Sequence, residues 1–205
     1  MNLLERMSAF HASASWAVWG SARPSEPFTR NSDISLPPEA HEVVHGRAIL
    51  VGLNPGNAAA ARPMSGWANF HAGPKHNDHL IAEAFRATPY WGAYMTDLHR
   101  QIESNSSLVR PGHDVVAGDV QSLFEQLRLL EPDPLLICFG ADTFTRLTRH
   151  ATWLATKLGL EQIRTLRILH YSGVAAGHHK NRPETYRALV HGALRDAGLP
   201  CCTEH

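Results

Sequence analysis

Short apolar runs alternate with amphipathic segments along this chain of 205 residues, and this alternation limits its possible folds more than any other feature. The apolar runs have the length of buried strands and cover residues 48–53, 92–98, 135–139 and 165–171. The amphipathic segments have helical spacing and cover residues 77–87, 115–130, 142–158 and 182–197. Strands that alternate with helices predict a parallel sheet covered on both faces. We therefore expect an α/β fold in a single domain, residues 1–205.

The first 45 residues fit this alternation less well. An amphipathic helix over residues 3–19 is predicted by apolar side chains at helical spacing, namely Leu4, Met7, Phe10 and Trp16. Residues 21–38 are rich in Pro, Ser and Asn, which predicts a loop. We therefore expect residues 1–45 to form an N-terminal helical and loop extension.

Composition narrows the class of protein. Hydrophobic residues make up 43% of the chain, which suits a packed core and argues against disorder. Lys and Arg balance Asp and Glu at 19 each, which argues against a histone-like coat protein. No apolar run is long enough for a membrane-spanning helix, and Glu5 makes the start of the chain a poor signal peptide. We expect a cytoplasmic location and no membrane association.

Cysteine and histidine usage argues against bound metal. Three cysteines are too few for a secreted disulfide framework or for a four-cysteine iron–sulfur cluster within the chain. The fourteen histidines include a pair in HNDH, residues 76–79, but this is not the His-Glu-x-x-His zinc pattern, and the chain has no Cys-x-x-Cys. We expect free thiols, no metal site, no cofactor and a monomer.

Charge is unevenly distributed along the chain. Residues 141–195 hold nine basic and three acidic residues, and the remaining residues hold ten basic and sixteen acidic ones. The basic segment is interpreted either as a solvated helical face or as a side that faces phosphates.

Two segments at the carboxyl ends of expected strands carry residues suited to chemistry, and ligands bind at that edge of a parallel sheet. In GLNPGN, residues 52–57, the glycines allow a ligand close to the backbone, and the Asn54 amide can hold a water. In HYSGVAAGHH, residues 170–179, His170 can donate to an oxygen that becomes negatively charged. The alternatives are an ordinary strand-to-loop turn and a strand-end histidine with satisfied hydrogen bonds.

Together GLNPG, LLICFGADTF and HYSG resemble the motifs of the uracil-DNA glycosylase superfamily, most closely its mismatch-specific and single-strand-selective branches. The order and spacing of the motifs agree with the family over residues 48–194. The resemblance implies a three-layer α/β/α sandwich around a four-stranded parallel sheet. It also implies a metal-independent DNA glycosylase, which hydrolyses the N-glycosidic bond of a damaged or mismatched base, such as uracil, during DNA repair.

The resemblance also implies roles for individual residues. Asn54 would position the attacking water, and His170 would stabilise the departing base anion. The flipped base would be bound by Gly52, Thr96 and Asp97 and stacked on an aromatic ring, Phe70 or Trp67. Residues 172–177 would fill the gap that the base leaves. Contacts to the DNA backbone would come from Ser172, Gly173, His178, His179, Lys180 and Lys75.

Two residues depart from the family pattern. Asp97 stands where many members carry Asn, and Tyr171 stands where the family has Pro. An ionised Asp only accepts hydrogen bonds, so it would face the lone pairs of uracil O4 and repel the developing anion. Asp97 is therefore protonated, points elsewhere, or faces a base with an exocyclic amine. We expect a specificity other than plain uracil excision.

Two other functions remain open. The chain could be a nucleic-acid-binding relative that has lost catalysis, or a hydrolase of free nucleosides. Retained Asn54 and His170 weigh against the first alternative.

Overall fold

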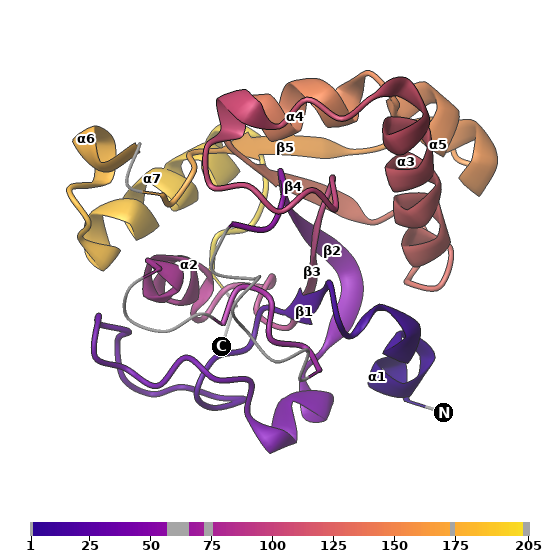
Figure 1. Cartoon of the computed structure of the whole chain (residues 1–205). Coiled ribbons are helices and arrows are strands. Elements are labelled where there is room, and N and C mark those ends of the chain that lie inside the picture. The colour runs from indigo at the N-terminus through magenta and orange to yellow at the C-terminus, as the bar shows by residue number, and fades with distance from the viewer. Residues whose placement is uncertain (1, 57–65, 72–75, 173–174, 203–205) are drawn as a thin grey trace.

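The computed structural model describes residues 2–56, 66–71, 76–172 and 175–202, and it contains one sheet of five strands (Figure 1). The strand order is β1-β3-β2-β4-β5. The strands are β1 (Ser15–Trp16), β2 (His45–Gly52), β3 (Ala93–Asp97), β4 (Leu135–Phe139) and β5 (Thr165–Ile168). The predicted parallel strands are confirmed, since β3, β2, β4 and β5 are mutually parallel. The expected total of four strands was wrong, because β1 adds an antiparallel edge strand beside β3.

Strand β1 lies inside the segment that was predicted to be one helix, so that prediction was also wrong. Only α1 (Leu3–Arg6) and a 3-10 turn (Ser8–Phe10) are helical there. In the sequence WAVW, residues 16–19, Trp16 and Val18 enter one core cluster, whereas Ala17 and Trp19 enter the other. An alternation with a period of two is typical of an extended chain. Pairing with β3 holds the chain in this extended conformation.

Helices lie on both faces of the sheet, as the alternation predicted. One face is covered by α2 (Asp78–Phe85) and α7 (Pro183–Asp196), and the other by α3 (His113–Leu127), α4 (Gly140–Thr148) and α5 (Ala151–Leu158) (Figure 1). The helix predicted over residues 142–158 is thus two helices, separated at His150, whose backbone leaves helical geometry (φ −108°, ψ 1°). A four-residue helix, α6 (Ala176–His179), precedes α7.

Residues 2–45 contribute to the core of the domain and are not appended to it. Met7, Trp16 and Trp19 have no exposed surface, and Phe28 and Ile34 are buried. A 3-10 turn, Pro38–Glu42, then leads into β2. The segment that was expected to form an N-terminal helical and loop extension thus supplies the edge strand and buried aromatic side chains on both faces of the sheet.

Among the described residues, no helix combines the length and apolar character needed to cross a membrane. Cys138, Cys201 and Cys202 are free thiols.

Candidate functional site

The carboxyl ends of β2 and β3 place Gly52 directly beside Asp97, since the strand register pairs these two residues. A Cβ atom on Gly52 would lie 2.1 Å from Oδ1 of Asp97 and 3.2 Å from Cζ of Phe70. Only glycine therefore allows this approach of a carboxyl group and an aromatic ring to the backbone. Three of the residues predicted to bind a base are thus in contact.

Asn54 follows β2 in an orientation that hydrogen bonds determine. Its Nδ2 group lies 3.0 Å from the carbonyl oxygens of Pro55 and Gln101 and 2.6 Å from that of Glu103. Three carbonyl oxygens around one atom identify it as the nitrogen, because an amide oxygen would be repelled there. Oδ1 is consequently the acceptor atom of this amide.

Two of the three carbonyls that orient Asn54, those of Gln101 and Glu103, belong to a segment that runs alongside the GLNPG motif. The N–H groups of Leu98, His99 and Glu103 donate to the carbonyls of Gly52, Leu53 and Pro55, each at 2.9 Å. The backbone from Leu98 to Glu103 thus continues the pairing of β2 with β3 beyond the sheet. Its position sets the orientation of the Asn54 side chain.

A buried polar network fastens this segment to the helices behind it. The His99 ring donates from Nδ1 to Asp119 on α3 at 3.1 Å, and Arg100 donates to the other oxygen of that carboxylate at 2.9 Å. Arg146 on α4 donates to the Val109 carbonyl at 2.9 Å and approaches Nε2 of His99 at 3.5 Å. Burial lowers the pKa of His99, although Asp119 opposes this shift. We infer that the network holds the segment in register with Asn54.

Asp97 carries an unusual carboxyl group. Nδ2 of Asn69 donates to its Oδ2 at 2.9 Å, while Oδ1 faces Gly52. Burial raises the pKa of Asp97 to about 7, and the hydrogen bond from Asn69 opposes the shift without cancelling it. At neutral pH the side chain is therefore present in both forms: a carboxylic acid that can donate and a carboxylate that only accepts.

Aromatic rings connect Asp97 with the last strand. The Phe70 ring lies 6.3 Å from Phe139 at the end of β4, and Phe139 lies 6.4 Å from His170 and 5.2 Å from Tyr171. The His170 and Tyr171 rings stack at 4.8 Å with an interplanar angle of 11°. Tyr171, which departs from the family pattern, thus supports the histidine.

His170 has a defined tautomer. The backbone N–H of Ser172 donates to its Nδ1 at 3.0 Å, so Nδ1 carries the lone pair and Nε2 carries the proton. Burial lowers the pKa of His170 to about 4, helped by His179 and opposed by Asp142. The ring is consequently neutral at physiological pH and offers one N–H donor.

Two predicted base-binding residues lie away from this group. Thr96 is buried, and because side chains alternate along β3 it faces the opposite side of the sheet from Asp97. Trp67 packs against Trp16 at 5.6 Å and His11 at 6.5 Å, within the opposite core cluster. Phe70 is therefore the aromatic residue that the structure brings to Gly52 and Asp97.

The residues predicted to contact the DNA backbone separate into two groups. His178 and Lys180 are exposed, and Ser172 is half-buried. His179 has no exposed surface: its Nε2 donates to the Ser172 carbonyl at 3.2 Å, and its Nδ1 accepts from the Asn181 N–H at 3.0 Å. His179 therefore holds the loop after β5 and does not face solvent. Gly173 and Lys75 lie outside the described residues.

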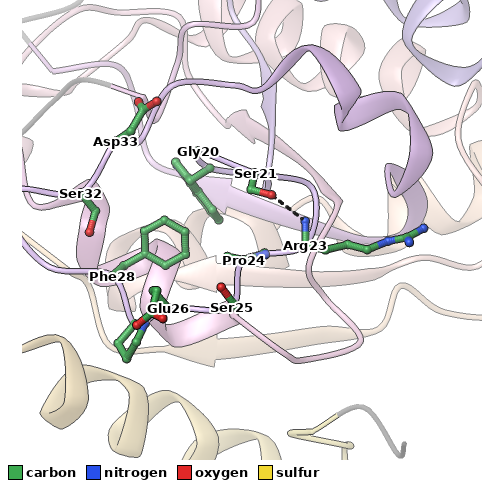
Figure 2. Close-up of a pocket in the computed structure, with 11 residues that line it drawn as sticks. Gly20, Ser21, Arg23, Pro24, Ser25, Glu26, Phe28, Ser32 and Asp33 are labelled. Atoms are coloured by element: carbon green, nitrogen blue, oxygen red, sulfur yellow. Dashed lines mark hydrogen bonds between the residues drawn. The ribbon is translucent and has the colours of Figure 1, made fainter.

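A separate pocket of about 340 Å³ opens within the loop after β1 (Figure 2). All residues from Trp19 to Phe28 except Ala22 line it together with Ser32 and Asp33, and the Arg23 N–H donates to Ser21 Oγ. None of these residues follows a parallel strand, so the pocket is distinct from the candidate site.

Sequence reasoning missed Asn69 and the network around Asp119. Asn69 is a loop residue next to Phe70, and no periodic pattern marks it. Asp119 did leave a signal: it lies four and eight residues before the buried Leu123 and Leu127, so a carboxylate occupies the apolar face of an amphipathic helix. A charge at such a position needs a buried partner.

Comparison with models of known protein families and with curated protein sequences gives no match to this chain.

Proposed function

We propose that this protein is a metal-independent DNA glycosylase that hydrolyses the N-glycosidic bond of a damaged or mismatched base. The observation that carries the proposal is the orientation of two side chains at one edge of the sheet. Asn54 has its amide N–H groups engaged by carbonyls, and His170 has its Nδ1 engaged by a backbone N–H. Each residue keeps the atom that the reaction needs: an acceptor on Asn54 and a donor on His170.

In this mechanism Asn54 binds the attacking water. Oδ1 accepts one O–H of the water and directs an oxygen lone pair at C1′ of the deoxyribose. An amide cannot remove a proton at neutral pH, so its contribution is position and not general-base catalysis. The three carbonyls around Nδ2 prevent the amide from rotating and presenting a donor to the water.

His170 acts on the departing base. As the glycosidic bond breaks, the base takes the bonding electrons and negative charge gathers on its carbonyl oxygen. The Nε2–H group of the neutral ring donates to that oxygen, as a preorganised donor of the kind that contributes about 2.7–4 kcal/mol. Because the pKa of His170 is lowered to about 4, the ring stays neutral and transfers no full proton at physiological pH.

Asp97 and Phe70 are proposed to recognise the base. The Phe70 ring, whose Cζ lies beside Gly52, would stack on the base, and Oδ1 of Asp97 would meet the edge of the base. The protonated carboxyl donates to a carbonyl oxygen of uracil or thymine, whereas the ionised carboxyl accepts from an exocyclic amine. The DNA backbone would lie over Ser172, His178 and Lys180. Free thiols at all three cysteines agree with a cytoplasmic protein.

A panel of oligonucleotides tests the proposal. Single- and double-stranded substrates carry uracil, mismatched thymine, hypoxanthine or another damaged base, and free-base release is followed by chromatography. We expect release from at least one lesion by the wild type and none by Asn54→Ala. Asn31→Ala, a change at an exposed asparagine, is the matched control and should retain full activity.

Other outcomes of the same panel identify the alternative functions. Binding to DNA without base release from any lesion would make the protein a non-catalytic relative. Saturable turnover of free nucleosides, with none on DNA, would make it a nucleoside hydrolase. Either result contradicts the proposal.

A further inference from the structure

The C-terminal end of α7 brings together three side chains that sequence spacing did not connect. A ring nitrogen of His191 and the sulfur atoms of Cys201 and Cys202 all lie within 4.8 Å of one another. The two Sγ atoms are 4.0 Å apart. With Zn–S bonds of about 2.3 Å and tetrahedral angles, two thiolates on one zinc ion are about 3.8 Å apart. We propose that His191, Cys201 and Cys202 bind a thiophilic metal ion, with zinc as the cation.

A defined turn builds this arrangement. Gly198 has φ +69°, and the N–H groups of Gly198 and Leu199 donate to the carbonyls of Arg195 and Leu194 at 2.9 Å. The turn reverses the chain after α7 and returns Cys201 to the helix face that carries Arg195. His191 is four residues before Arg195 and therefore lies on the same face.

The histidine has the support that metal-binding imidazoles usually have. Its Nε2 lies 2.9 Å from the carbonyl of Ala84 on α2. Because a carbonyl only accepts, Nε2 carries the proton, and the lone pair is on Nδ1. The ring is buried in the fold, so the position of this ligand is fixed.

Two cysteines and one histidine form a ligand set for a divalent cation. Two thiolates and a neutral imidazole would carry a charge of −2, which Zn²⁺ neutralises. The Arg195 guanidinium donates from its NH1 group to Cys201 Sγ at 3.8 Å and would stabilise the thiolate form of Cys201. Three protein ligands leave the fourth tetrahedral position to water or another ligand.

The cluster lies far from the proposed glycosylase site. Helix α7 follows the carboxyl end of β5 and packs against β5 and α2. The helix therefore runs back along the sheet, and its C-terminal end lies toward the amino edge. The proposed metal ion would thus bind at the edge opposite Asn54 and His170, and the inference does not depend on the proposed function.

A zinc titration of the reduced full-length protein, in competition with a chromogenic chelator and without oxygen, tests this inference. We expect one Zn²⁺ per chain. Removing a group that only hydrogen-bonds to a metal ligand lowers metal affinity by about 10–100-fold. Cys201→Ser and Cys202→Ser remove a ligand itself, so each should lower zinc affinity by at least this factor. Cys202 is exposed, so we expect its substitution to leave the fold intact. Co²⁺ in place of Zn²⁺ should give a thiolate charge-transfer band.

Cys138→Ser is the control, because Cys138 is buried in β4 and belongs to neither the cluster nor the surface. It should bind zinc as the wild type does. The inference is overturned if the reduced wild type fails to bind one zinc ion, or if Cys201→Ser and Cys202→Ser bind it as tightly as the wild type.

Discussion

Asp97 is the residue at the candidate site whose charge changes closest to neutral pH. Its pKa is raised from 3.8 to about 7 because the carboxyl group is buried against Gly52 and Phe70. The folded protein therefore holds this proton over a pH range in which the unfolded chain has lost it. As the pH rises from 3.8 to about 7, the free energy of unfolding therefore falls. Above pH 7 the folded protein bears the whole destabilisation by the buried carboxylate.

We expect Asp97→Asn to stabilise the protein in a pH-dependent manner. An uncharged amide avoids the cost of a buried carboxylate, which is roughly 4 kcal/mol for a shift of this size. The gain in melting temperature should be near zero at pH 4, grow up to about pH 7 and then stay constant. Asp114→Asn, at an exposed position, should show no such trend. A gain that is the same at pH 4 and pH 8 would contradict the assignment.

The same residue should control the pH dependence of base excision. On uracil, the wild-type rate should fall as pH rises through about 7, because the ionised Asp97 faces lone pairs and repels the base anion. The rate of Asp97→Asn should be flat from pH 6 to 8, since His170, with its pKa lowered to about 4, remains neutral over this range. Identical profiles and identical base preferences in the two proteins would remove Asp97 from recognition.

From the sequence, the position of a candidate site residue can be predicted where a strand end defines it. Asn54, Asp97 and His170 stand at or near the carboxyl ends of apolar runs, so the geometry of a parallel sheet places them at one edge, whereas their roles remain predictions. Trp67 and His179 occupy loops, and their contacts depend on the tertiary path of the chain. Trp67 packs on Trp16, and His179, which was expected to contact the DNA backbone, is buried and donates to the Ser172 carbonyl.

At the level of elements, the segment after β3 connects the helices to the candidate site. Its carbonyls at Gln101 and Glu103 orient Asn54, and the His99–Asp119 contact anchors it to α3. The side chain of Asp119 is only 1% exposed, so its two hydrogen bonds have no competition from water. A change at Asp119 should therefore act on Asn54 from a distance.

We expect Asp119→Asn to lower kcat by about tenfold or more with little change in KM. The substitution should displace the segment that orients Asn54, and a displacement of about 1 Å at a catalytic group can lower the rate strongly even when the change lies far away. An amide Nδ2 group at this position would face a donor, which should cost about 1–3 kcal/mol of stability. Glu125→Gln, on the same helix but in a surface ion pair with Arg128, is the matched control. A variant that is destabilised but fully active would assign Asp119 a purely structural role.

The N-terminal segment provides a second test at this level. Trp16 on β1 is completely buried and contacts Trp67 and Tyr94. Removal of such a side chain leaves a cavity, and Trp16→Ala should cost about 3–5 kcal/mol in denaturant unfolding. Trp153→Ala should cost much less, because Trp153 is 38% exposed. Equal losses would argue that β1 is not part of the cooperative core.

The sequence predicted the parallel strands and most helices because these have periodic patterns. It did not predict β1, which has two residues and no turn signal before it. The spacing of Leu4, Met7, Phe10 and Trp16 favoured a helix, but pairing with Met95 and Tyr94 on β3 overrides that local preference.

For the whole molecule, several of the basic residues in 141–195 lie in ion pairs or away from the candidate site. Arg187 pairs with Glu83, and Arg164 pairs with Asp133. Lys157, near the end of α5, lies toward the amino edge of the sheet, because the chain must return there before β5. Lys180 and Arg182 are exposed between α6 and α7, in the part of the chain that follows His170. We therefore expect only a few contacts between basic side chains and DNA phosphates.

We expect weak, salt-dependent binding to undamaged duplex. Two phosphate contacts correspond to a slope of about −2 in log K against log salt. Lys180→Gln should reduce the slope by about 1, and Lys157→Gln should leave it unchanged. Fluorescence anisotropy at several salt concentrations measures both. A steep slope that neither variant alters would place the DNA on another face.

The central claim is that Asn54 and His170 cleave a glycosidic bond together. Its most direct test is the single-turnover rate of free-base release from the preferred lesion, measured for the wild type, Asn54→Ala, His170→Ala and the exposed control His41→Ala. The account predicts a fall of about 10²–10³ for His170→Ala, an equal or larger fall for Asn54→Ala, and no change for His41→Ala, with DNA binding retained in all four proteins. Base release at the wild-type rate by either of the first two variants would contradict it.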